Sequence, residues 1–231
     1  MLYVDIEKRL DRCTLKAKFE CNGTALALFG ASGAGKSMTL KCIAGIEKPD
    51  RGVIQLNDKI LFDSEKRIDL PPQKRKVGYL FQEYALFPNM TVSGNITTGM
   101  RKLPKQERKY KLHELIERFH LNGMENRRPD TLSGGEKQRV ALARIFASSP
   151  EVLLLDEPFS SLDTLLKYQL IPYIRKIITD FGGETLMVSH DIDEVRQLCG
   201  VVTPITDGVT ADTVDTEAYN IQLKEQYENL K

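Results

Sequence analysis

The segment Gly30-Ala31-Ser32-Gly33-Ala34-Gly35-Lys36-Ser37 decides the organisation of this chain of 231 residues. The first and last of its glycines lie five positions apart and are followed by Lys and Ser, which is the pattern of a phosphate-binding loop. A glycine-rich turn that leads into a helix presents successive backbone N–H groups to phosphate oxygens, because no Cβ blocks their approach. Lys36 would then reach the β- and γ-phosphates of a nucleotide, and Ser37 would coordinate Mg²⁺.

The residues on either side have the structure that such a loop requires. Residues 25–29 are apolar and predict a buried strand, while Leu40, Ile43 and Ala44 form a helical stripe that stops at Gly45. A glycine turn that happens to precede Lys-Ser could be purely structural. The strand before it and the helix after it favour a nucleotide site.

Composition indicates an ordinary globular protein, with 41% hydrophobic and 28% charged residues. A net charge of +1 gives no overall attraction to nucleic acid, so no nucleic-acid partner is expected. No apolar run approaches the roughly 20 residues of a membrane span, and the N-terminus lacks signal-peptide features, so we expect a cytosolic chain. The four cysteines have no metal-binding spacing and are expected to be small buried residues.

The first part of the chain predicts antiparallel strands. Residues 2–6 and 13–19 alternate apolar and polar side chains, as half-buried strands do. Residues 53–56 and 60–62 indicate a hairpin, and Pro71-Pro72 predicts a rigid turn.

The middle of the chain predicts a helical insert. An apolar strand over residues 77–81 leads to Gln82, and turn signals follow at residues 87–89 and 93–95. Apolar residues spaced by three and four predict a helix around residues 112–119.

The last part predicts parallel strands. Residues 151–157 form an apolar strand that ends in two carboxylates, and residues 185–189 form another with His190 at its end. A helix is expected over residues 166–178, with a kink or a break at Pro172. The polar tail predicts a docked terminal helix. Its apolar stripe consists of Tyr219, Leu223, Tyr227 and Leu230.

Further features can be connected to the loop by their chemistry. Asp156 is placed to hold Mg²⁺ through water beside Ser37, and Glu157 is a candidate general base for the attacking water. Gln82 and His190 each follow a strand, where one could orient that water and the other could contact the γ-phosphate.

A second anion site is expected where Ser133, Gly134 and Gly135 open a helix, because free N–H groups and the helix dipole favour negative charge there. Taken singly, these features also have structural explanations, as a strand-end cap, a structural histidine or a helix cap. Their joint occurrence in this order is much harder to explain by structure alone.

Together these residues resemble the nucleotide-binding subunits of ATP-binding cassette (ABC) transporters, over the chain to about residue 200. The matching motifs are Walker A (residues 30–37), the Q-loop Gln82, the signature (132–136), Walker B (153–157), the D-loop (161–163) and the switch His190. The resemblance implies an α/β P-loop NTPase (RecA-like) fold, a parallel-sheet core with an antiparallel β subdomain and a helical insert. We expect the core in residues 1–82 and 145–231 and the helical subdomain in residues 83–144.

The same resemblance implies a homodimer that holds two ATP molecules with Mg²⁺, each between the Walker A loop of one copy and the signature of the other. The implied residues are, for catalysis, Glu157, His190 and Gln82; for nucleotide binding, residues 30–38 with Ser133, Gly134 and Gly135; and for Mg²⁺, Ser37, Gln82 and Asp156.

Within the family, residues 82–92 look like the importer type whose substrates include molybdate, sulfate, polyamines, iron and sugars, and residues 70–79, 132–140 and 170–174 are most similar to molybdate importer ATPases. The implied partners are an integral-membrane permease and, indirectly, an extracytoplasmic solute-binding protein. The implied location is the cytoplasmic face of the cell membrane.

Three departures from the family pattern change the expectations. Met38 stands where Thr is usual, which we expect to be tolerated because Ser37 remains. The chain ends without the regulatory barrel common in this importer type, so feedback through such a domain is not expected. No aromatic residue lies between Glu7 and Arg12 to stack on adenine, and Arg9 or Arg12 could replace part of that contact.

The alternative is a soluble ABC ATPase acting in DNA or ribosome metabolism. Such a protein would need coiled-coil inserts, a duplicated cassette or a basic groove. One cassette and a net charge of +1 favour the transport ATPase. A generic P-loop kinase would leave the signature unexplained.

Overall fold

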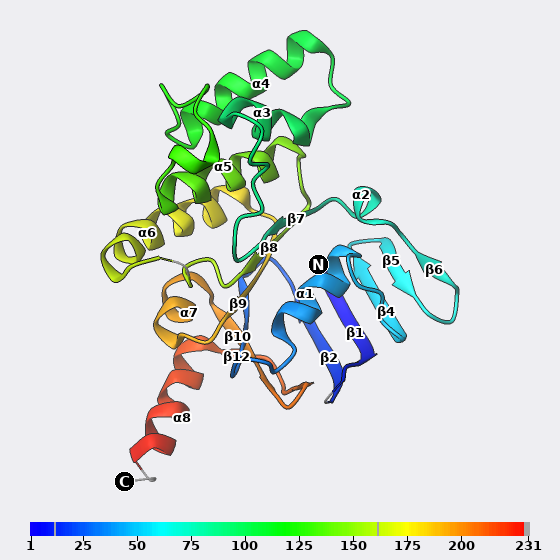
Figure 1. The fold of residues 1–231 in the computed structure, drawn as a ribbon. Helices are drawn as coiled ribbons and strands as arrows, with labels where there is room; N and C mark the ends of the chain where they lie inside the picture. Colours follow the sequence, from blue (N-terminus) through cyan, green and yellow to red (C-terminus); the bar gives the residue numbers. More distant parts are fainter. Residues whose placement is uncertain (12, 161, 229–231) are drawn as a thin grey trace.

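The computed structural model describes residues 1–11, 13–160 and 162–228, and its strands form one mixed sheet (Figure 1). The strand order is β6-β5-β4-β1-β2-β11-β10-β3-β9-β8-β7, with β12 paired to β10. The strands are β1 (Leu2–Arg9), β2 (Thr14–Cys21), β3 (Leu26–Phe29), β4 (Arg51–Leu56), β5 (Lys59–Asp63), β6 (Ile68–Asp69), β7 (Val77–Leu80), β8 (Val152–Asp156), β9 (Glu184–Ser189), β10 (Val201–Thr206), β11 (Val209–Thr210) and β12 (Val214–Asp215).

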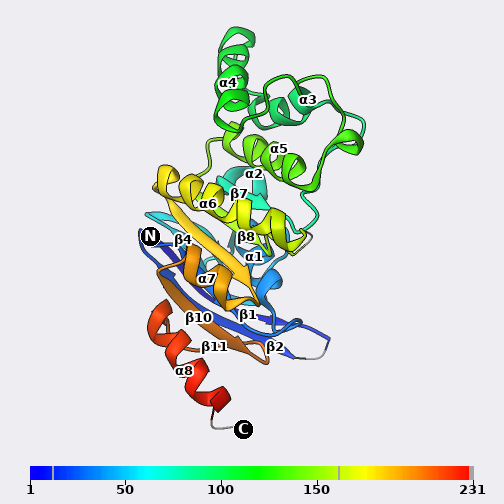
Figure 2. The same ribbon diagram turned by 90° about the vertical axis from the view of Figure 1, so that its left-hand side faces the viewer.

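Helices cover the parallel part of this sheet and form a separate group at one end of the molecule. The α-helices are α1 (Lys36–Ala44), α2 (Pro72–Arg75), α3 (Val92–Thr97), α4 (Lys105–Arg118), α5 (Gly134–Ala147), α6 (Thr164–Phe181), α7 (Ile192–Leu198) and α8 (Thr216–Glu228), and the 3₁₀ turns are η1 (Thr98–Met100) and η2 (Pro129–Thr131). Figures 1 and 2 place α4 at one end and α8 at the other. In the part of the chain that the structure describes, no helix combines the length and the apolar character that a membrane span needs.

The antiparallel strands predicted ahead of the loop are confirmed and longer than expected. β1 pairs with β2 and β4, and β4 forms the predicted hairpin with β5. Side chains of β2 alternate between exposed and buried along the whole strand. The apolar row faces the core that also contains α1.

The parallel strands β10, β3, β9, β8 and β7 lie side by side in that order. Successive side chains of a strand point to opposite faces, so β8 divides its residues between two cores. Val152 and Leu154 pack with α1, whereas Leu153 and Leu155 pack with α5 and α6. The sheet therefore separates the helix that follows the glycine loop from the helix that follows Ser133.

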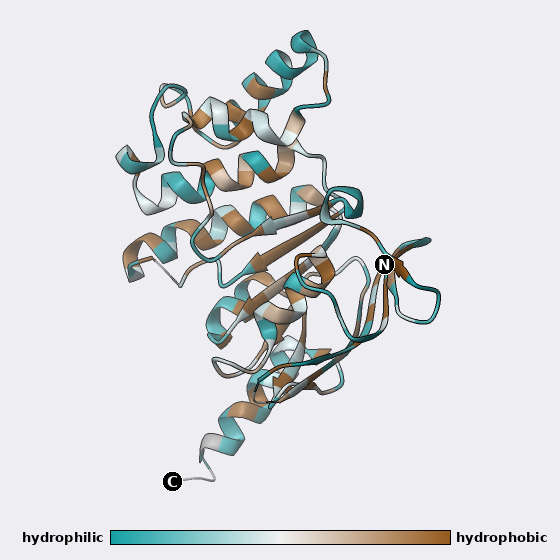
Figure 3. Ribbon diagram, turned by 45° about the vertical axis from the view of Figure 1, so that its right-hand side comes forward, coloured by the Kyte–Doolittle hydropathy of each residue, from teal (hydrophilic) through white to brown (hydrophobic). Residues whose placement is uncertain are grey.

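The residues between β7 and β8 contain α3, α4 and α5, as the helical prediction requires. Leu115, Ile116 and Phe119 are buried, while much of α4 is hydrophilic (Figure 3). The division into core and helical subdomain stays a prediction. Its second boundary falls within α5, which continues to Ala147.

One local prediction is wrong, and two others need correction in part. The turn expected at Pro71-Pro72 is the single helical turn α2, in which the N–H of Lys74 donates to the carbonyl oxygen of Pro71 at 2.9 Å. Pro72 occupies the first helical position, which does not need an N–H group. The expected turn at residues 93–95 lies within α3, whose start is capped by Thr91 Oγ1 accepting from the N–H of Gly94 at 3.1 Å. The break expected at Pro172 does not occur: α6 is one helix, held against the core by residues on both sides of the proline, including Leu170 and Ile174. A kink at Pro172 stays a prediction.

The terminal helix is confirmed as α8. Its Tyr219 ring meets the ring of Phe29 edge-on, with centroids 5.8 Å apart. Leu223 is half-buried, and Leu230 of the predicted stripe lies outside the described residues. The cysteines are free thiols; Cys21, Cys42 and Cys199 are buried, as predicted, and Cys13 is partly exposed.

Candidate nucleotide-binding site

The glycine loop joins β3 to α1 in the backbone conformation that the sequence pattern requires. Gly33 and Gly35 have φ angles of +83° and +98°, in the left-handed region that favours glycine. A Cβ on Gly30 would lie 2.2 Å from the carbonyl oxygen of Ile205, so only glycine fits there. Gly35 is the N-cap of α1 and has no side chain to bond the first helical N–H groups. These groups are available to an anion.

Lys36 lies across the loop. Its Nζ donates to the carbonyl oxygens of Gly30 at 2.8 Å and Ala31 at 2.9 Å. Burial lowers the pKa of Lys36, while the charges of Glu157 and Asp156 act in the opposite direction. The ammonium group is thus held in the concave side of the loop, where phosphate oxygens would be stronger acceptors than the carbonyls.

Asp156 receives hydrogen bonds from two sides. Ser37 Oγ donates to its Oδ1 and Tyr79 Oη donates to its Oδ2, each at 2.7 Å. Asp156 ends β8 and Tyr79 lies on the neighbouring parallel strand β7. Burial and the hydrogen bond to Asp156 both raise the pKa of Tyr79, so its phenol stays a donor. Sequence reasoning missed Tyr79, although the pairing of β7 with β8 would have identified it.

This pair of oxygen ligands fits Mg²⁺. A serine hydroxyl and a carboxylate within hydrogen-bond distance are hard ligands of the kind Mg²⁺ prefers, and the ion keeps water and phosphate oxygens in its shell. Among the described residues, no cluster of three His, Cys, Asp or Glu side chains could hold a metal ion.

Replacing Tyr79 by Phe tests the role of this hydrogen bond. A hydrogen bond to a charged group contributes about 1.5–3 kcal/mol, so we expect the Mg²⁺ concentration for half-maximal nucleotide binding to rise about tenfold or more. Calorimetric titration of ADP binding at increasing Mg²⁺ measures this half-maximal concentration. Tyr173→Phe is the control, because the buried Tyr173 hydroxyl has no hydrogen-bond partner in the structure as described. Equal Mg²⁺ dependence in both variants would contradict the role.

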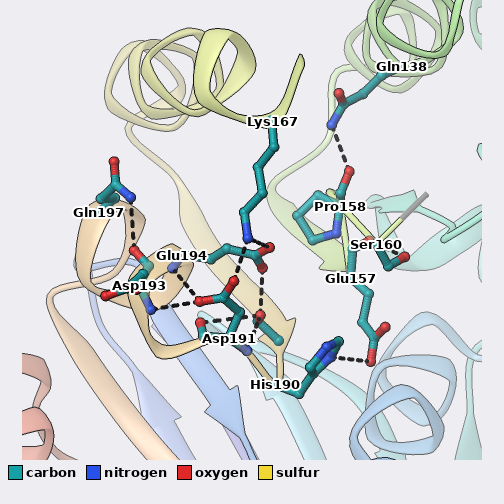
Figure 4. A network of polar contacts seen from close by, with 11 residues as sticks. Gln138, Glu157, Pro158, Ser160, Lys167, His190, Asp191, Asp193, Glu194 and Gln197 are labelled. Carbon is teal, nitrogen blue, oxygen red and sulfur yellow. Dashed lines mark hydrogen bonds and ion pairs between the residues drawn. The ribbon is translucent and has the colours of Figure 1, made fainter. Parts of the chain in front are cut away.

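Glu157 and His190 come together at the carboxyl ends of two neighbouring parallel strands, β8 and β9 (Figure 4). Glu157 Oε1 lies 3.5 Å from His190 Nδ1. The Glu157 side chain is 15% exposed and the imidazole 59%. Glu157 has a φ of +45°, and its N–H donates to the carbonyl oxygen of Val188 at 3.1 Å. Such a conformation costs a non-glycine residue about 1–3 kcal/mol and is concentrated at functional sites.

Gln82 follows β7, and its side chain is exposed. Among the hydrogen bonds of the described residues, those of Ser37 and Asp156 do not include Gln82. Two residues further along, Tyr84 and Ala85 have positive φ angles, and Arg144 of α5 donates to both of their carbonyl oxygens, at 2.9 and 2.7 Å. The backbone after Gln82 is thus anchored to the helical part of the chain. Its roles in catalysis and Mg²⁺ binding stay predictions.

Ser133 is the N-cap of α5 and forms a capping box with Glu136. Ser133 Oγ accepts from the N–H of Glu136 at 3.3 Å, and Glu136 Oε2 accepts from the N–H of Ser133 at 2.7 Å. The bond from the Ser133 N–H holds the pKa of Glu136 below its ordinary value. Gly134 and Gly135 face Leu162 and Leu166, where a Cβ would be at 3.0 and 3.3 Å.

The structure does not bring this second anion site to the first within one chain. No described hydrogen bond or ion pair joins residues 133–135 to residues 30–38, and α5 and α1 pack on opposite faces of β8. A connection missed from sequence is Gln138 of α5, fully buried, whose Nε2 donates to the carbonyl oxygen of Pro158 at 3.1 Å, next to Glu157. Ser161 of the predicted D-loop lies outside the described residues.

The two remaining sequence predictions concern Met38 and the nucleotide base. Met38 is half-buried on α1 and packs against the core shared with the antiparallel strands. Leu10 lies in the turn between β1 and β2, its N–H bonded to the carbonyl oxygen of Cys13 at 2.8 Å, and Arg9 is exposed. Arg12 lies outside the described residues. How the base is contacted stays a prediction.

The loop with Lys36, the Ser37–Asp156 bond and the Glu157–His190 pair define a nucleoside-triphosphate site of the P-loop class. The sequence profile described as "ABC transporter" matches residues 16–160. The chain therefore belongs to the ABC transporter family, which confirms the resemblance seen in its motifs.

Known proteins agree with this assignment. The chain is 39% identical over 211 residues to the molybdenum import ATP-binding protein ModC of Paramagnetospirillum magneticum and 41% identical over 211 residues to ModC of Rhodospirillum rubrum. Each alignment covers 91% of this chain but only 58% and 57% of the relative, so the chain spans little more than half the length of these relatives.

A solved structure confirms the fold. The dimeric post-hydrolysis structure of the ATP-binding cassette MJ0796 with ADP and Pi has a TM-score of 0.77 and 24% identity to this chain, covering 94% of this chain and 99% of that one. The predicted α/β P-loop NTPase fold is therefore confirmed.

Proposed function

We propose that this chain is the ATP-hydrolysing subunit of a molybdate importer. The observation that supports hydrolysis is the site itself, where Ser37 bonds Asp156 at 2.7 Å beneath the loop and Glu157 lies 3.5 Å from His190. The names of the ModC relatives support molybdate as the transported solute.

Each group of the site has a task in this proposal. The N–H groups of the loop and Lys36 would hold the triphosphate, and Asp156 with Ser37 would hold Mg²⁺, which would supply positive charge to neutralise the phosphate oxygens. Glu157 accepts a proton from the attacking water. His190 faces Glu157 through Nδ1, which leaves Nε2 to bond the γ-phosphate. Gln82 would complete the site by moving toward Mg²⁺.

The separated signature site supports a dimer. Because α5 and α1 pack on opposite faces of the sheet, the N–H groups after Ser133 serve a phosphate more readily when it is bound by a second copy. A head-to-tail homodimer would place each loop opposite a Ser133 of its partner. ATP would then hold the two copies together.

Assembly with a permease is proposed through the segment after Gln82, which would place the chain at the cytoplasmic face of the membrane. Phe87 is 44% exposed. Its backbone is held by Asn95, whose Oδ1 accepts from the Phe87 N–H at 2.8 Å and whose Nδ2 donates to the Phe87 carbonyl oxygen at 3.1 Å. Arg144 lies 5.3 Å from the ring centre. An exposed aromatic ring on a backbone held in this way can pack against an apolar surface of a partner.

Phe87→Asp is expected to reduce co-purification with the permease while the isolated subunit keeps its basal ATP hydrolysis, because the contacts described for the Phe87 backbone and ring are with Asn95 and Arg144 and not with the Ser37–Asp156 or Glu157–His190 groups. Tyr110→Asp is the control, since Tyr110 is an aromatic residue 72% exposed on α4. Unchanged assembly and transport in Phe87→Asp would place the contact surface elsewhere.

Reconstitution tests the whole proposal. The chain is purified with its membrane partner and the matching solute-binding protein, placed in vesicles, and assayed for ATP hydrolysis with molybdate, sulfate, a polyamine or a sugar. Molybdate is expected to stimulate hydrolysis most. If another solute alone stimulates hydrolysis, molybdate is rejected as the transported solute while the ATPase activity stands. If the chain hydrolyses no nucleotide, both parts of the proposal are rejected.

A further inference from the structure

We propose that Lys167 is a positioning residue for hydrolysis: it ties α6 to Asp191 and Glu194, which follow His190, and so holds the imidazole beside Glu157. This inference rests on the proposed function, because it requires Glu157 and His190 to act on ATP. Lys167 belongs to none of the motifs seen in the sequence.

Lys167 lies between two carboxylates (Figure 4). Its Nζ forms ion pairs with Asp191 and, at 2.8 Å, with Glu194. The side chains of Lys167, Asp191 and Glu194 are 23%, 32% and 8% exposed, so the cluster is partly shielded from water. Such pairs are screened less by salt than surface pairs and depend more strongly on each partner.

The cluster fixes the backbone on both sides of His190. Glu194 Oε2 accepts from Ser189 Oγ at 2.6 Å, and Ser189 Oγ accepts from the N–H of Asp191 at 3.0 Å. Asp191 Oδ1 also caps α7 by accepting from the N–H of Asp193 at 2.9 Å. The imidazole itself is more than half exposed, so its position depends on the backbone that carries it.

Lys167 also connects this segment to the one that carries Glu157. Glu157 is followed by a short segment that ends at Asp163, whose Oδ1 caps α6 by accepting from the N–H of Leu166 at 2.9 Å. Lys167 is the next residue of that helix. Its ion pairs therefore link the two segments whose side chains meet at 3.5 Å.

The charges explain why loss of the ammonium would disturb this arrangement. Burial alone would lower the pKa of Lys167, but its hydrogen bonds to Asp191 and Glu194 raise the pKa above the ordinary value. Burial alone would raise the pKa of Asp191, but the bond from Lys167 lowers it. Without the ammonium, the carboxylates of Asp191 and Glu194 would repel each other, and Asp191 directly follows His190.

Lys167→Met keeps an unbranched side chain one atom shorter and removes its charge. We expect kcat for ATP to fall about tenfold, because small misplacement of a reacting group is costly, with KM and ATP binding nearly unchanged. Lys167→Arg should restore most of kcat. The control is Arg196→Met, which removes an exposed cation of α7 that pairs with Glu217 at 3.2 Å and should leave kcat unchanged. Glu194→Gln should lower kcat by the same factor as Lys167→Met. It replaces Lys167→Met as the test if the Lys167→Met protein folds poorly.

A double-mutant cycle shows whether the effect passes through His190. Adding Lys167→Met to His190→Ala should reduce kcat by less than twofold beyond His190→Ala alone, since the two changes act on one group. If the losses of kcat in the two single variants multiply in the double variant, or if Lys167→Met no longer binds ATP, the positioning role would be overturned and the proposed function would stand. Absence of ATP hydrolysis by the unaltered chain would overturn both.

Discussion

Glu157→Gln is expected to bind ATP normally and to hydrolyse it about 10²- to 10⁴-fold more slowly than the unaltered chain. The amide has the shape of the carboxylate but cannot accept the proton of the attacking water. The backbone at Glu157, with a φ of +45° and an N–H bonded to Val188, presents the side chain to His190 in either variant. The effect should therefore lie in kcat alone.

Single-turnover hydrolysis and calorimetric ATP binding measure the two quantities separately. Glu151→Gln is the matched control, because Glu151 lies just before the other end of β8 and pairs with Lys76 on the surface. Since hydrolysis should release the dimer, Glu157→Gln is also expected to elute as a dimer with ATP and as a monomer without it. Hydrolysis near the unaltered rate would remove Glu157 from the role of base.

Mixing Lys36→Ala chains with Ser133→Arg chains is expected to restore hydrolysis that neither variant has alone. Removing one group that stabilises developing charge typically costs about 10²- to 10³-fold, so each variant by itself should be nearly inactive. In a head-to-tail heterodimer both changes fall in one composite site and the other site is intact. At equal ratio, about a quarter of the composite sites are then intact.

The structure explains why the two residues are expected to act across the dimer. Ser133 and Lys36 begin helices that pack on opposite faces of β8, and no described hydrogen bond or ion pair joins their segments. Ser133→Arg also removes a helix cap worth about 1 kcal/mol, so thermal unfolding of that variant is measured first. Two Lys36→Ala preparations mixed together are the control. No recovery in heterodimers shown to form would argue for action within one chain.

The sequence by itself determined the family and predicted where the nucleotide would bind. Three short segments could be predicted locally, because their own residues set their backbone conformation. They are the glycine loop, the apolar strand before Asp156 and the capped helix at Ser133. Local patterns failed in two places, for different reasons. Residues 93–95 belong to α3 because Thr91 and Asn95 bond neighbouring backbone groups, a local effect that the turn pattern did not reveal. At Pro172 the reason is tertiary, since burial of α6 on both sides of the proline keeps that helix whole.

Only the tertiary structure decided which side chains meet. Tyr79 reaches Asp156 because β7 pairs with β8, and Glu157 reaches His190 because β8 pairs with β9. Lys167 meets Asp191 and Glu194 through the packing of α6 against α7. Each of these contacts depends on the order of strands and on side-chain directions set by packing. Residue spacing along the chain predicts neither the strand order nor these side-chain directions, because contacts between distant segments form only when the whole sheet and its helices are assembled.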